Sequence, residues 1–304
     1  MSQLAKMGRA AGTTIAAMIC LIPAIWAQQP ASGALPVRYE ELTALEFIQA
    51  VQKSSSVALI PMGILEKHGP HLPLGTDLLD VREVSLRAAA QEYCLVYPPY
   101  YFGQIFEAKH QPGTIAYSQE LIWQMLQETC DELARNGIRK MILVNGHGGN
   151  NSFIRYFCQA QLAKKRDYAV FIFDPIGDPD TEAKIKAMRK TTLDGHAGEE
   201  ETSTIMVHRP DLAHKERAGL QSGADQKRLD HLHDAYTAIW WYARYPNHYA
   251  GDGSAGNREL GEMAIKAYAS QLAKMIGEIK KDQKVLELQN QFFKESENPL
   301  STKQ

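Results

Sequence analysis

Three stretches of the sequence combine histidine with carboxylate or glycine residues in patterns that suit metal binding. In residues 63–77, Glu66 and His68 lie two positions apart, so an extended backbone points both to one side and Lys67 to the other. The glycine- and proline-rich turn that follows can return Asp77 toward them, which adds a second carboxylate. The alternative is a loop whose charged side chains are simply solvated.

A second stretch, residues 145–150, places His147 among three glycines. Glycines at this density permit positive φ and close backbone approach, which a surface turn rarely needs. We interpret His147 as a ligand that is presented at the end of a strand. A glycine-rich turn with an incidental histidine, or a loop that binds an anion, is the alternative.

The third stretch, residues 194–203, contains His196 and three consecutive glutamates. Glutamates at the start of a helix are usually solvated and favoured by the helix dipole, so we expect only one of them to face inward. Glu201 lies five residues after His196, and the two side chains can reach one cavity from the loop and from the first helical turn.

Together these stretches offer two imidazoles and three carboxylates, from Glu66, His68, Asp77, His147 and Glu201. Nitrogen and oxygen ligands in this mixture suit Zn²⁺ or Mn²⁺, and the excess of carboxylates favours a pair of ions over one structural zinc. Two divalent cations lower the pKa of a shared water and polarise a carbonyl group. The expected chemistry is therefore hydrolysis without a nucleophilic serine or cysteine.

Unbroken apolar runs alternate with helical patterns along the chain. They predict strands at residues 57–63, 95–97, 141–144 and 169–173, and helices at residues 80–93, 118–136, 152–165 and 255–288. Such strands are typical of a parallel sheet that is covered on both faces. We therefore predict an α/β fold, a single three-layer domain with a mostly parallel sheet and helices on both faces. Ligands bind such sheets at the carboxyl ends of the strands.

The chain has 304 residues, of which 44% are hydrophobic and 22% are charged, which is enough for one large core. A formal net charge of −2 offers no field that would hold a polyanion, so we expect no nucleic-acid partner. Cys94, Cys130 and Cys158 are widely spaced, which favours buried free thiols over disulfides or a thiolate metal site.

The first residues have the pattern of a secretory signal. Lys6 and Arg9 precede an apolar run at residues 15–27, and a polar segment follows. The run is too short to cross a hydrocarbon layer of about 30 Å as a helix; an uncleaved anchor is the alternative. We predict a signal peptide at residues 1–27, a hydrolase domain at residues 37–288 and a polar tail at residues 289–304. The mature protein is expected to be secreted or periplasmic, without membrane contact beyond the signal.

The three stretches resemble the signature of the creatininase family, the creatinine amidohydrolase-like metal hydrolases. The family pattern Glu-x-His-Gly-x-His-Leu-Pro-x-x-Thr-Asp is matched from Glu66 to Asp77. Further matches follow in the same order at Pro112-Gly113-Thr114, Asn145-Gly146-His147, His196-Ala197-Gly198 and Gly251-Asp252. The resemblance covers about residues 40 to 285 and implies a creatininase-like fold.

The resemblance also implies a role for each ligand. Glu66, Asp77 and His147 would hold one ion, while His68, Asp77 and Glu201 would hold the other, so that Asp77 bridges the two. The ions would be Zn or Mn, with Fe as a further option.

Other residues are assigned roles by the same resemblance. His196 matches the family histidine that donates a proton to the leaving nitrogen, and Glu199 or Glu200 would raise its protonated fraction. The substrate carbonyl or a water would be held by Gly148, Gly149 and Asn150.

The chain departs from the creatinine-hydrolysing members in two places. It has His147-Gly148-Gly149-Asn150 at the place where those members share the sequence His-Tyr-Glu-Asn. It also lacks the tryptophan that they have shortly before the position of His196. The first departure shifts the ligand role to Glu201, and both argue against creatinine as the substrate. The aromatic run at residues 240–242 is expected in the core or in a subunit contact. Structural or surface roles are expected for His208, His214, His231, His233 and His248.

These patterns predict an exported, dinuclear metal-dependent amidohydrolase that acts on a C–N bond of a small amide, cyclic amides included. The resemblance further implies a homo-oligomer, often a hexamer. The alternative is a non-catalytic periplasmic metal- or ligand-binding protein that retains the creatininase fold.

Overall fold

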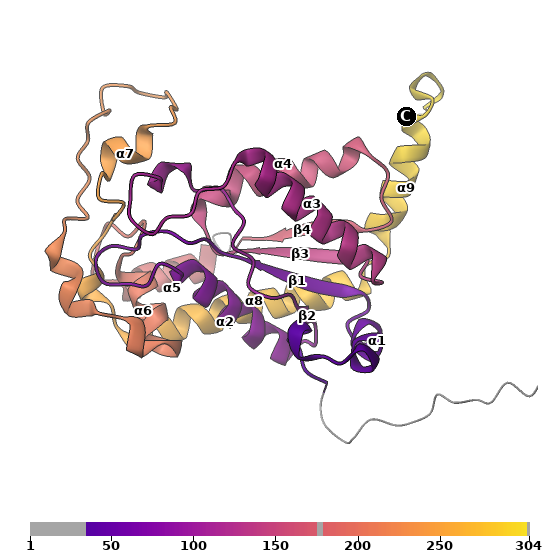
Figure 1. The fold of residues 1–304 in the computed structure, drawn as a ribbon, viewed down its shortest axis with the longest axis horizontal. Coiled ribbons are helices and arrows are strands. Elements are labelled where there is room, and N and C mark those ends of the chain that lie inside the picture. Colours follow the sequence, from indigo (N-terminus) through magenta and orange to yellow (C-terminus); the bar gives the residue numbers. More distant parts are fainter. Residues whose placement is uncertain (1–34, 175–178, 303–304) are drawn as a thin grey trace, which may run out of the picture. The chain divides into compact units, whose positions relative to one another are not determined.

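A parallel sheet forms the centre of the computed structural model, which describes residues 35–174 and 179–302 (Figure 1). The predicted signal peptide therefore lies outside the described residues. The strands are β1 (Val57–Met62), β2 (Leu95–Val96), β3 (Lys140–Asn145) and β4 (Ala169–Phe173), in the spatial order β2-β1-β3-β4. Every neighbouring pair is parallel.

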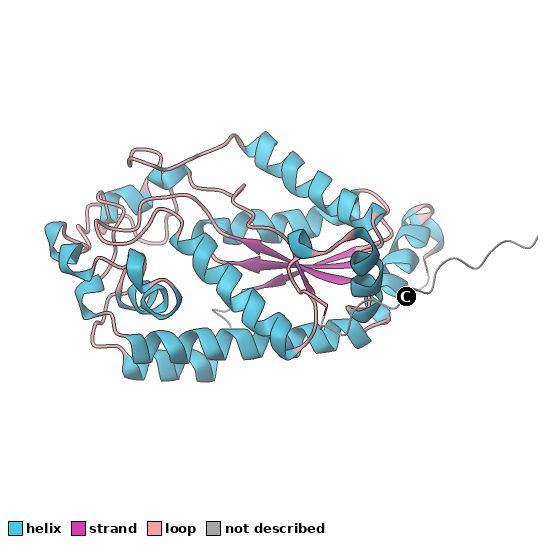
Figure 2. Ribbon diagram, turned by 60° about the horizontal axis from the view of Figure 1, so that its bottom comes forward, coloured by secondary structure: helices cyan, strands magenta, loops and turns pink. Residues whose placement is uncertain are grey.

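Helices cover both faces of the sheet, with α2 and α8 on one side and α3 and α4 on the other (Figures 1 and 2). The helices are α1 (Ala44–Lys53), α2 (Thr76–Gln91), α3 (Gln119–Arg135), α4 (Asn151–Ala160), α5 (Pro179–Met188), α6 (Glu199–His208), α7 (Trp240–Arg244), α8 (Arg258–Lys281) and α9 (Lys284–Ser296). The predicted α/β class, with a parallel sheet between two helical layers, is confirmed.

Alternation along the strands explains why both faces are covered. Val57 and Leu59 of β1 pack into the core shared with α2 and α8, whereas Ala58 and Ile60 pack into the core shared with α3 and α4. Since all six residues of β1 are buried, neither face of the strand can be left to solvent.

Two glycines let the start of α2 approach the ends of the central strands. A Cβ atom on Gly63, directly after β1, would lie 2.4 Å from the backbone nitrogen of Leu78. A Cβ atom on Gly146, directly after β3, would lie 2.6 Å from the Cβ of Val81. Because neither position has a side chain, the first turn of α2 fits against both strand ends and carries Asp77 between them.

Two predicted helix boundaries are wrong. Helix α2 begins at Thr76 rather than at residue 80, because Thr76 bonds back to the Pro73 carbonyl through its backbone N–H and its hydroxyl. The long helix expected at residues 255–288 is broken at Asp282, whose extended backbone ends α8 and whose carboxylate accepts N–H groups at the start of α9. Helix α9 therefore continues into the predicted polar tail.

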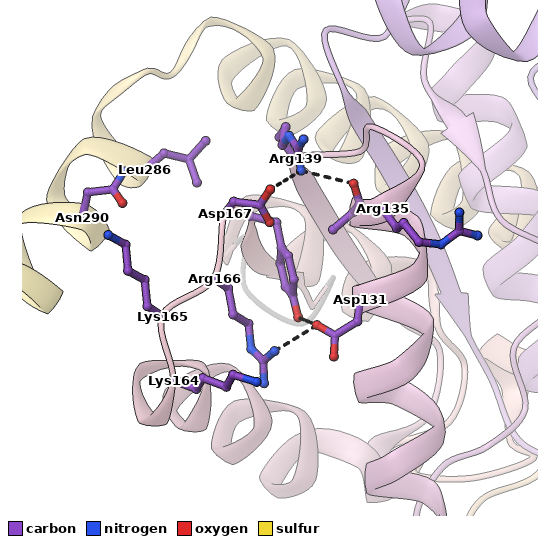
Figure 3. Close-up of a pocket in the computed structure, with 11 residues that line it drawn as sticks. Asp131, Arg135, Arg139, Lys164, Lys165, Arg166, Asp167, Leu286 and Asn290 are labelled. Carbon is purple, nitrogen blue, oxygen red and sulfur yellow. Dashed lines mark hydrogen bonds and ion pairs between the residues drawn. The ribbon is translucent and has the colours of Figure 1, made fainter.

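A cationic hollow of about 690 Å³ lies at the amino-terminal ends of β3 and β4 (Figure 3). Arg139 bonds to Asp167 at 2.6 Å, and Asp131 of α3 accepts bonds from Arg166 and from the Tyr168 hydroxyl. These ion pairs join α3 to the segments that precede the two strands. They lie at the opposite end of β3 from His147, and within the described residues no metal-ligand group occurs there.

Two further features bear on the sequence predictions. Cys94, Cys130 and Cys158 are free, as expected, although Cys158 is only partly buried. None of the helices in the described part of the chain is both long and apolar enough to cross a membrane.

We expect Gly63→Ala to lower the free energy of unfolding by about 1–3 kcal/mol, because the added methyl group meets backbone atoms of α2 that cannot rotate away. Urea unfolding monitored by circular dichroism measures this change. Gly219→Ala is the matched control, since a Cβ atom there meets nothing within 4 Å. Equal stability of the two variants would contradict the close approach of α2.

Candidate metal centre

The predicted ligands come together at the carboxyl ends of β1 and β3. The chain leaves β1 for β2 on one side and returns to β3 on the other, so the loops that follow these two neighbouring strands diverge and leave a crevice. Met62 and Asn145, the last residues of the two strands, pair directly. The loop after β1 carries Glu66 and His68, and the loop after β3 carries His147.

Two helix starts complete the ligand set. Asp77 lies in the first turn of α2 and Glu201 in the first turn of α6, where helix N-termini favour negative charge. Glu66 and His68 are completely buried, and Glu201 is the most exposed of the five ligands, with 34% of its side chain accessible. Lys67 points away and bonds to Gln221 and Asn247, as the expected alternation requires.

The first group of ligand atoms comes from Glu66, Asp77 and His147, which lie within 4.8 Å of one another. Nδ1 of His147 is 2.8 Å from Oε1 of Glu66 and 3.0 Å from Oδ2 of Asp77. Among the described residues, neither carboxylate oxygen has a hydrogen-bond partner, although both are buried. Ligand atoms that converge without bonding to one another leave their lone pairs for a cation.

A second group consists of His68, His196 and Glu201, whose ligand atoms lie within 4.8 Å of one another, and the other oxygen of Asp77 lies beside it. Nε2 of His68 lies 2.8 Å from Oδ1 of Asp77 and 3.9 Å from Oε2 of Glu201. Asp77 therefore presents one carboxylate oxygen to each histidine. This is the arrangement that a carboxylate bridging two ions requires.

Both histidines use their remaining ring nitrogen on a backbone carbonyl. Nδ1 of His68 faces the Glu66 carbonyl at 3.2 Å, and Nε2 of His147 faces the Gln104 carbonyl at 3.1 Å. A carbonyl only accepts, so these nitrogens carry the protons and the opposite nitrogens of the neutral rings carry lone pairs. Metal-binding histidines are usually held in this way. The residues thus fit divalent cations.

The electrostatics of the cluster favour added positive charge. Burial would lower the pKa of His147, but the charges of Glu66 and Asp77 outweigh it and raise the pKa well above its usual value. Burial is likewise outweighed at His68, where Asp77 and Glu201 raise the pKa to about 10. Burial raises the pKa of Glu201 to about 8. Bound cations would supply the positive charge that balances the carboxylates, which in their absence must come from protons on the histidines.

His196 lines the same chamber but is not poised as the sequence predicts. Its Nε2 donates to the Lys67 carbonyl at 2.8 Å, and burial lowers its pKa to about 3, so the ring is neutral. The expected help from Glu199 or Glu200 is absent in the described structure. Glu199 accepts the backbone N–H groups of Lys190 and Thr191, and Glu200 accepts the Tyr268 hydroxyl.

The predicted substrate-binding residues divide into two groups. Gly148 and Gly149 line the chamber, in the short 3₁₀ helix η3 (Gly148–Asn150). Asn150 is completely buried, and its Oδ1 accepts the backbone N–H of Gln104 at 2.9 Å. The prediction for Asn150 needs correction, because its side chain supports the neighbouring loop instead of facing the chamber.

The structure adds His248, which the sequence analysis assigned to a structural or surface role. His248 is buried, lines the chamber and bonds to Oε2 of Glu66. Trp241 donates its indole N–H to Nδ1 of His248 at 2.8 Å. Because Trp is only a donor, His248 must hold its proton on Nε2 and donate it to Glu66. This chain of bonds fixes one oxygen of Glu66 and leaves the other for an ion.

The aromatic run also differs from expectation, since Trp240 and Trp241 line the chamber rather than only the core. An antiparallel bridge between His196 and Ala250 brings this segment to the site. The one available signal for His248 was its position three residues before Gly251-Asp252. The chamber has a volume of about 260 Å³.

A parallel sheet with a buried cluster of histidine and carboxylate ligands at its carboxyl edge defines a metal-dependent hydrolase. The family model described as creatinine amidohydrolase matches residues 40–276. The chain therefore belongs to the creatininase family.

Named relatives are hydrolases with different substrates. The chain is 31% identical to creatinine amidohydrolase of Pseudomonas putida over 194 residues, which cover 58% of this chain and 74% of that protein. It is 25% identical to 3-dehydro-scyllo-inosose hydrolase of Thermotoga maritima over 265 residues, 79% of this chain and 83% of the relative. It is 30% identical to mycofactocin precursor peptide peptidase of Mycolicibacterium smegmatis over 161 residues, 51% and 59% of the two chains.

Solved structures agree on the fold. The crystal structure of creatinine amidohydrolase (creatininase) superimposes with a TM-score of 0.69 at 24% identity, over 82% of this chain and all of that one. Similar structures include a creatininase variant of Zn–Zn type and a Mn creatininase, with TM-scores of 0.68 and 0.67, each at 24% identity over 81% of this chain and 99% of the other.

We expect Trp241→Phe to weaken metal binding about tenfold or more, because the variant removes the donor that fixes the His248 ring and, through it, Glu66. Competition with a chromophoric chelator measures the affinity. Trp123→Phe is the control, since Trp123 packs against Phe153 and Phe157, away from the chamber. Unchanged affinity in the Trp241 variant would show that His248 does not orient Glu66.

Proposed function

We propose that the chain is a dinuclear metal-dependent amidohydrolase that cleaves a C–N bond in a small amide, cyclic amides included. The placement of Asp77 carries this proposal, because its two oxygens face His147 and His68 separately. Glu66 and His147 complete one ligand set, and His68 and Glu201 complete the other with the shared Asp77. Zn and Mn suit these ligands, and Fe is a further option.

Two bound cations would lower the pKa of a water and polarise the carbonyl group of the amide. The backbone of Gly148 and Gly149 lies beside that position and would orient the carbonyl. His196 keeps its Nε2 proton on the Lys67 carbonyl, so only Nδ1 is available to accept a proton from the attacking water. The water oxygen then bonds to the carbonyl carbon, and His196 returns the proton to the leaving nitrogen as the C–N bond breaks.

The rival function is a periplasmic protein of the same fold that binds a metal or ligand without turnover. Such a protein would be expected to lack a ligand or the proton-carrying histidine, whereas this chain has residues suited to both roles around one chamber, which supports the enzyme. Activity decides between the two. We expect at least one substrate among a panel of cyclic ureas, lactams, formamides and short peptides. Its hydrolysis should stop when a chelator is added and return with Zn or Mn. No hydrolysis of any compound in the panel would favour the non-catalytic binding protein.

We expect Asp77→Asn to reduce the metal content from two ions per chain and to lower kcat/KM by more than about a hundredfold. The amide nitrogen cannot ligate, and losing a ligand costs at least as much as losing a residue that orients one. Elemental analysis and steady-state kinetics provide the measurements. Glu83→Gln, on the same helix and paired with Arg87, is the control. Full occupancy in the Asp77 variant would contradict the assignment of the bridge.

We also propose export, on the support of the charged and apolar pattern of residues 1–27. Expression in a Gram-negative host should place the protein in the periplasm with a mature N-terminus at Gln28, which mass spectrometry of the purified protein determines. A full-length cytoplasmic product would contradict export. The expected homo-oligomer, a hexamer by family resemblance, is testable on the same sample by light scattering.

A further inference from the structure

A second, larger cavity adjoins the metal chamber. It has a volume of about 900 Å³, against about 260 Å³ for the chamber. The two share four lining residues, Glu107, Gly148, Gly149 and Trp240. A molecule held at the metal ligands can therefore extend into the larger space without leaving the protein surface.

The larger cavity, which we name the aromatic cavity, is lined mainly by large apolar side chains that are partly exposed. Phe106 of the 3₁₀ helix η2 (Phe106–Ala108) is 45% exposed, and Ile239 and Tyr242, at the start of and within α7, are 54% and 38% exposed. Phe153 and Tyr236 add to the same lining. Exposed apolar groups gathered in one hollow indicate a binding surface rather than chance exposure.

Two glycines line the junction of the two spaces. A Cβ atom on Gly148 would meet no other atom within 4 Å, so its position borders open space. A Cβ atom on Gly149 would lie 2.4 Å from Nε2 of His147 and 2.6 Å from Oε1 of Glu107. The missing side chain of Gly148 leaves open space where the two cavities adjoin, and the missing side chain of Gly149 makes room for His147 and the Glu107 carboxylate at the junction.

A few polar groups accompany the apolar walls. Oε2 of Glu107 accepts a bond from the Gln104 amide, and Nε2 of His110 donates to the Pro246 carbonyl. The His110 ring packs edge-on against the Tyr242 ring, with the two ring centroids 4.9 Å apart. This contact links the η2 loop to α7. An apolar cavity with a small number of placed polar groups is typical of a small-molecule site.

We propose that the aromatic cavity binds an apolar, ring-bearing group of the substrate while the scissile amide lies in the metal chamber. This inference rests on the proposed amidohydrolase function and narrows its substrate class. The continuity of the two spaces at Gly148 and Trp240 favours substrate over a second copy of the chain, because the cavity leads directly to the ligands. An amide without such a group would leave the apolar walls in water.

Matched substrate pairs test the proposal. N-formylglycine is compared with N-formyl-L-phenylalanine, and hydantoin with 5-benzylhydantoin, using the metal-loaded protein. We expect kcat/KM to be about tenfold higher or more for the ring-bearing member of the pair that is hydrolysed, since burial of an aromatic ring favours binding by at least that factor. Calorimetry with metal-stripped protein should show the same preference in affinity.

Variants locate the effect. The double variant Phe106→Ala, Ile239→Ala removes apolar surface from both walls, and Gly148→Leu fills the junction with the metal chamber. Each variant should lower kcat/KM for the ring-bearing substrate relative to kcat/KM for the small substrate. Each should lower the ratio of the two binding affinities in the same way. Tyr156→Ala is the control, because Tyr156 is an exposed aromatic residue on α4 that does not line the cavity. The control should keep the wild-type ratios.

The outcomes separate this proposal from the function on which it rests. Equal kcat/KM for both members of a hydrolysed pair, or equal or absent binding by the stripped protein, would overturn the aromatic cavity as a substrate site. A binding preference that the double variant abolishes, without hydrolysis of any pair, would support the cavity and count against the proposed activity. A changed oligomeric state of the double variant with unchanged ratios would assign the surface to a subunit contact and overturn the proposal.

Discussion

The gathering of three carboxylates, two of them buried, and several imidazoles around one chamber is the constraint on which the site depends. Carboxylates removed from water are unfavourable unless hydrogen bonds or opposite charges compensate them. Glu66 obtains one bond from His248, yet its other oxygen and Oδ2 of Asp77 face only the Nδ1 atom of His147. In its neutral form the ring carries a lone pair at that atom, and a cation between the three atoms would then offset the repulsion.

The fold supplies the means to hold these groups together. Ligands from the loops after β1 and β3 meet because the two strands are neighbours in the sheet and end at paired residues. Asp77 reaches the point between them only because Gly63 and Gly146 let α2 pack against the strand ends. The position of the Asp77 carboxylate thus depends on the missing side chains of Gly63 and Gly146 as much as on Asp77 itself. Helix α6 brings Glu201 from the other side by the same use of a helix start.

Sequence patterns predicted the sheet and the two helical layers and pointed to five candidate ligands that the fold brings close together, because each of these leaves a local signal. Glu66 and His68 share a face by strand alternation, and the glycines around His147 mark a strand end. His248 left no such signal. It reaches Glu66 across 182 positions of sequence through a bridge between Ala250 and His196, and a single histidine in an aromatic segment is more often structural. The partners of Glu199 and Glu200 were likewise hidden, since three consecutive glutamates do not reveal which neighbours they will meet.

In the proposed function, the chemistry and the choice of substrate would come from different parts of the chain. The ligands belong to loops that follow β1 and β3 and to the starts of α2 and α6, all of them held by the core. The walls of the larger cavity come instead from η2 and from the segment around α7, where large apolar side chains are partly exposed. Loops can change without disturbing the sheet, whereas the ligands cannot. Relatives named for different hydrolytic substrates are consistent with this division, and under the proposal above the choice of substrate would lie with residues such as Phe106, Ile239 and Tyr242 and not with the candidate metal ligands.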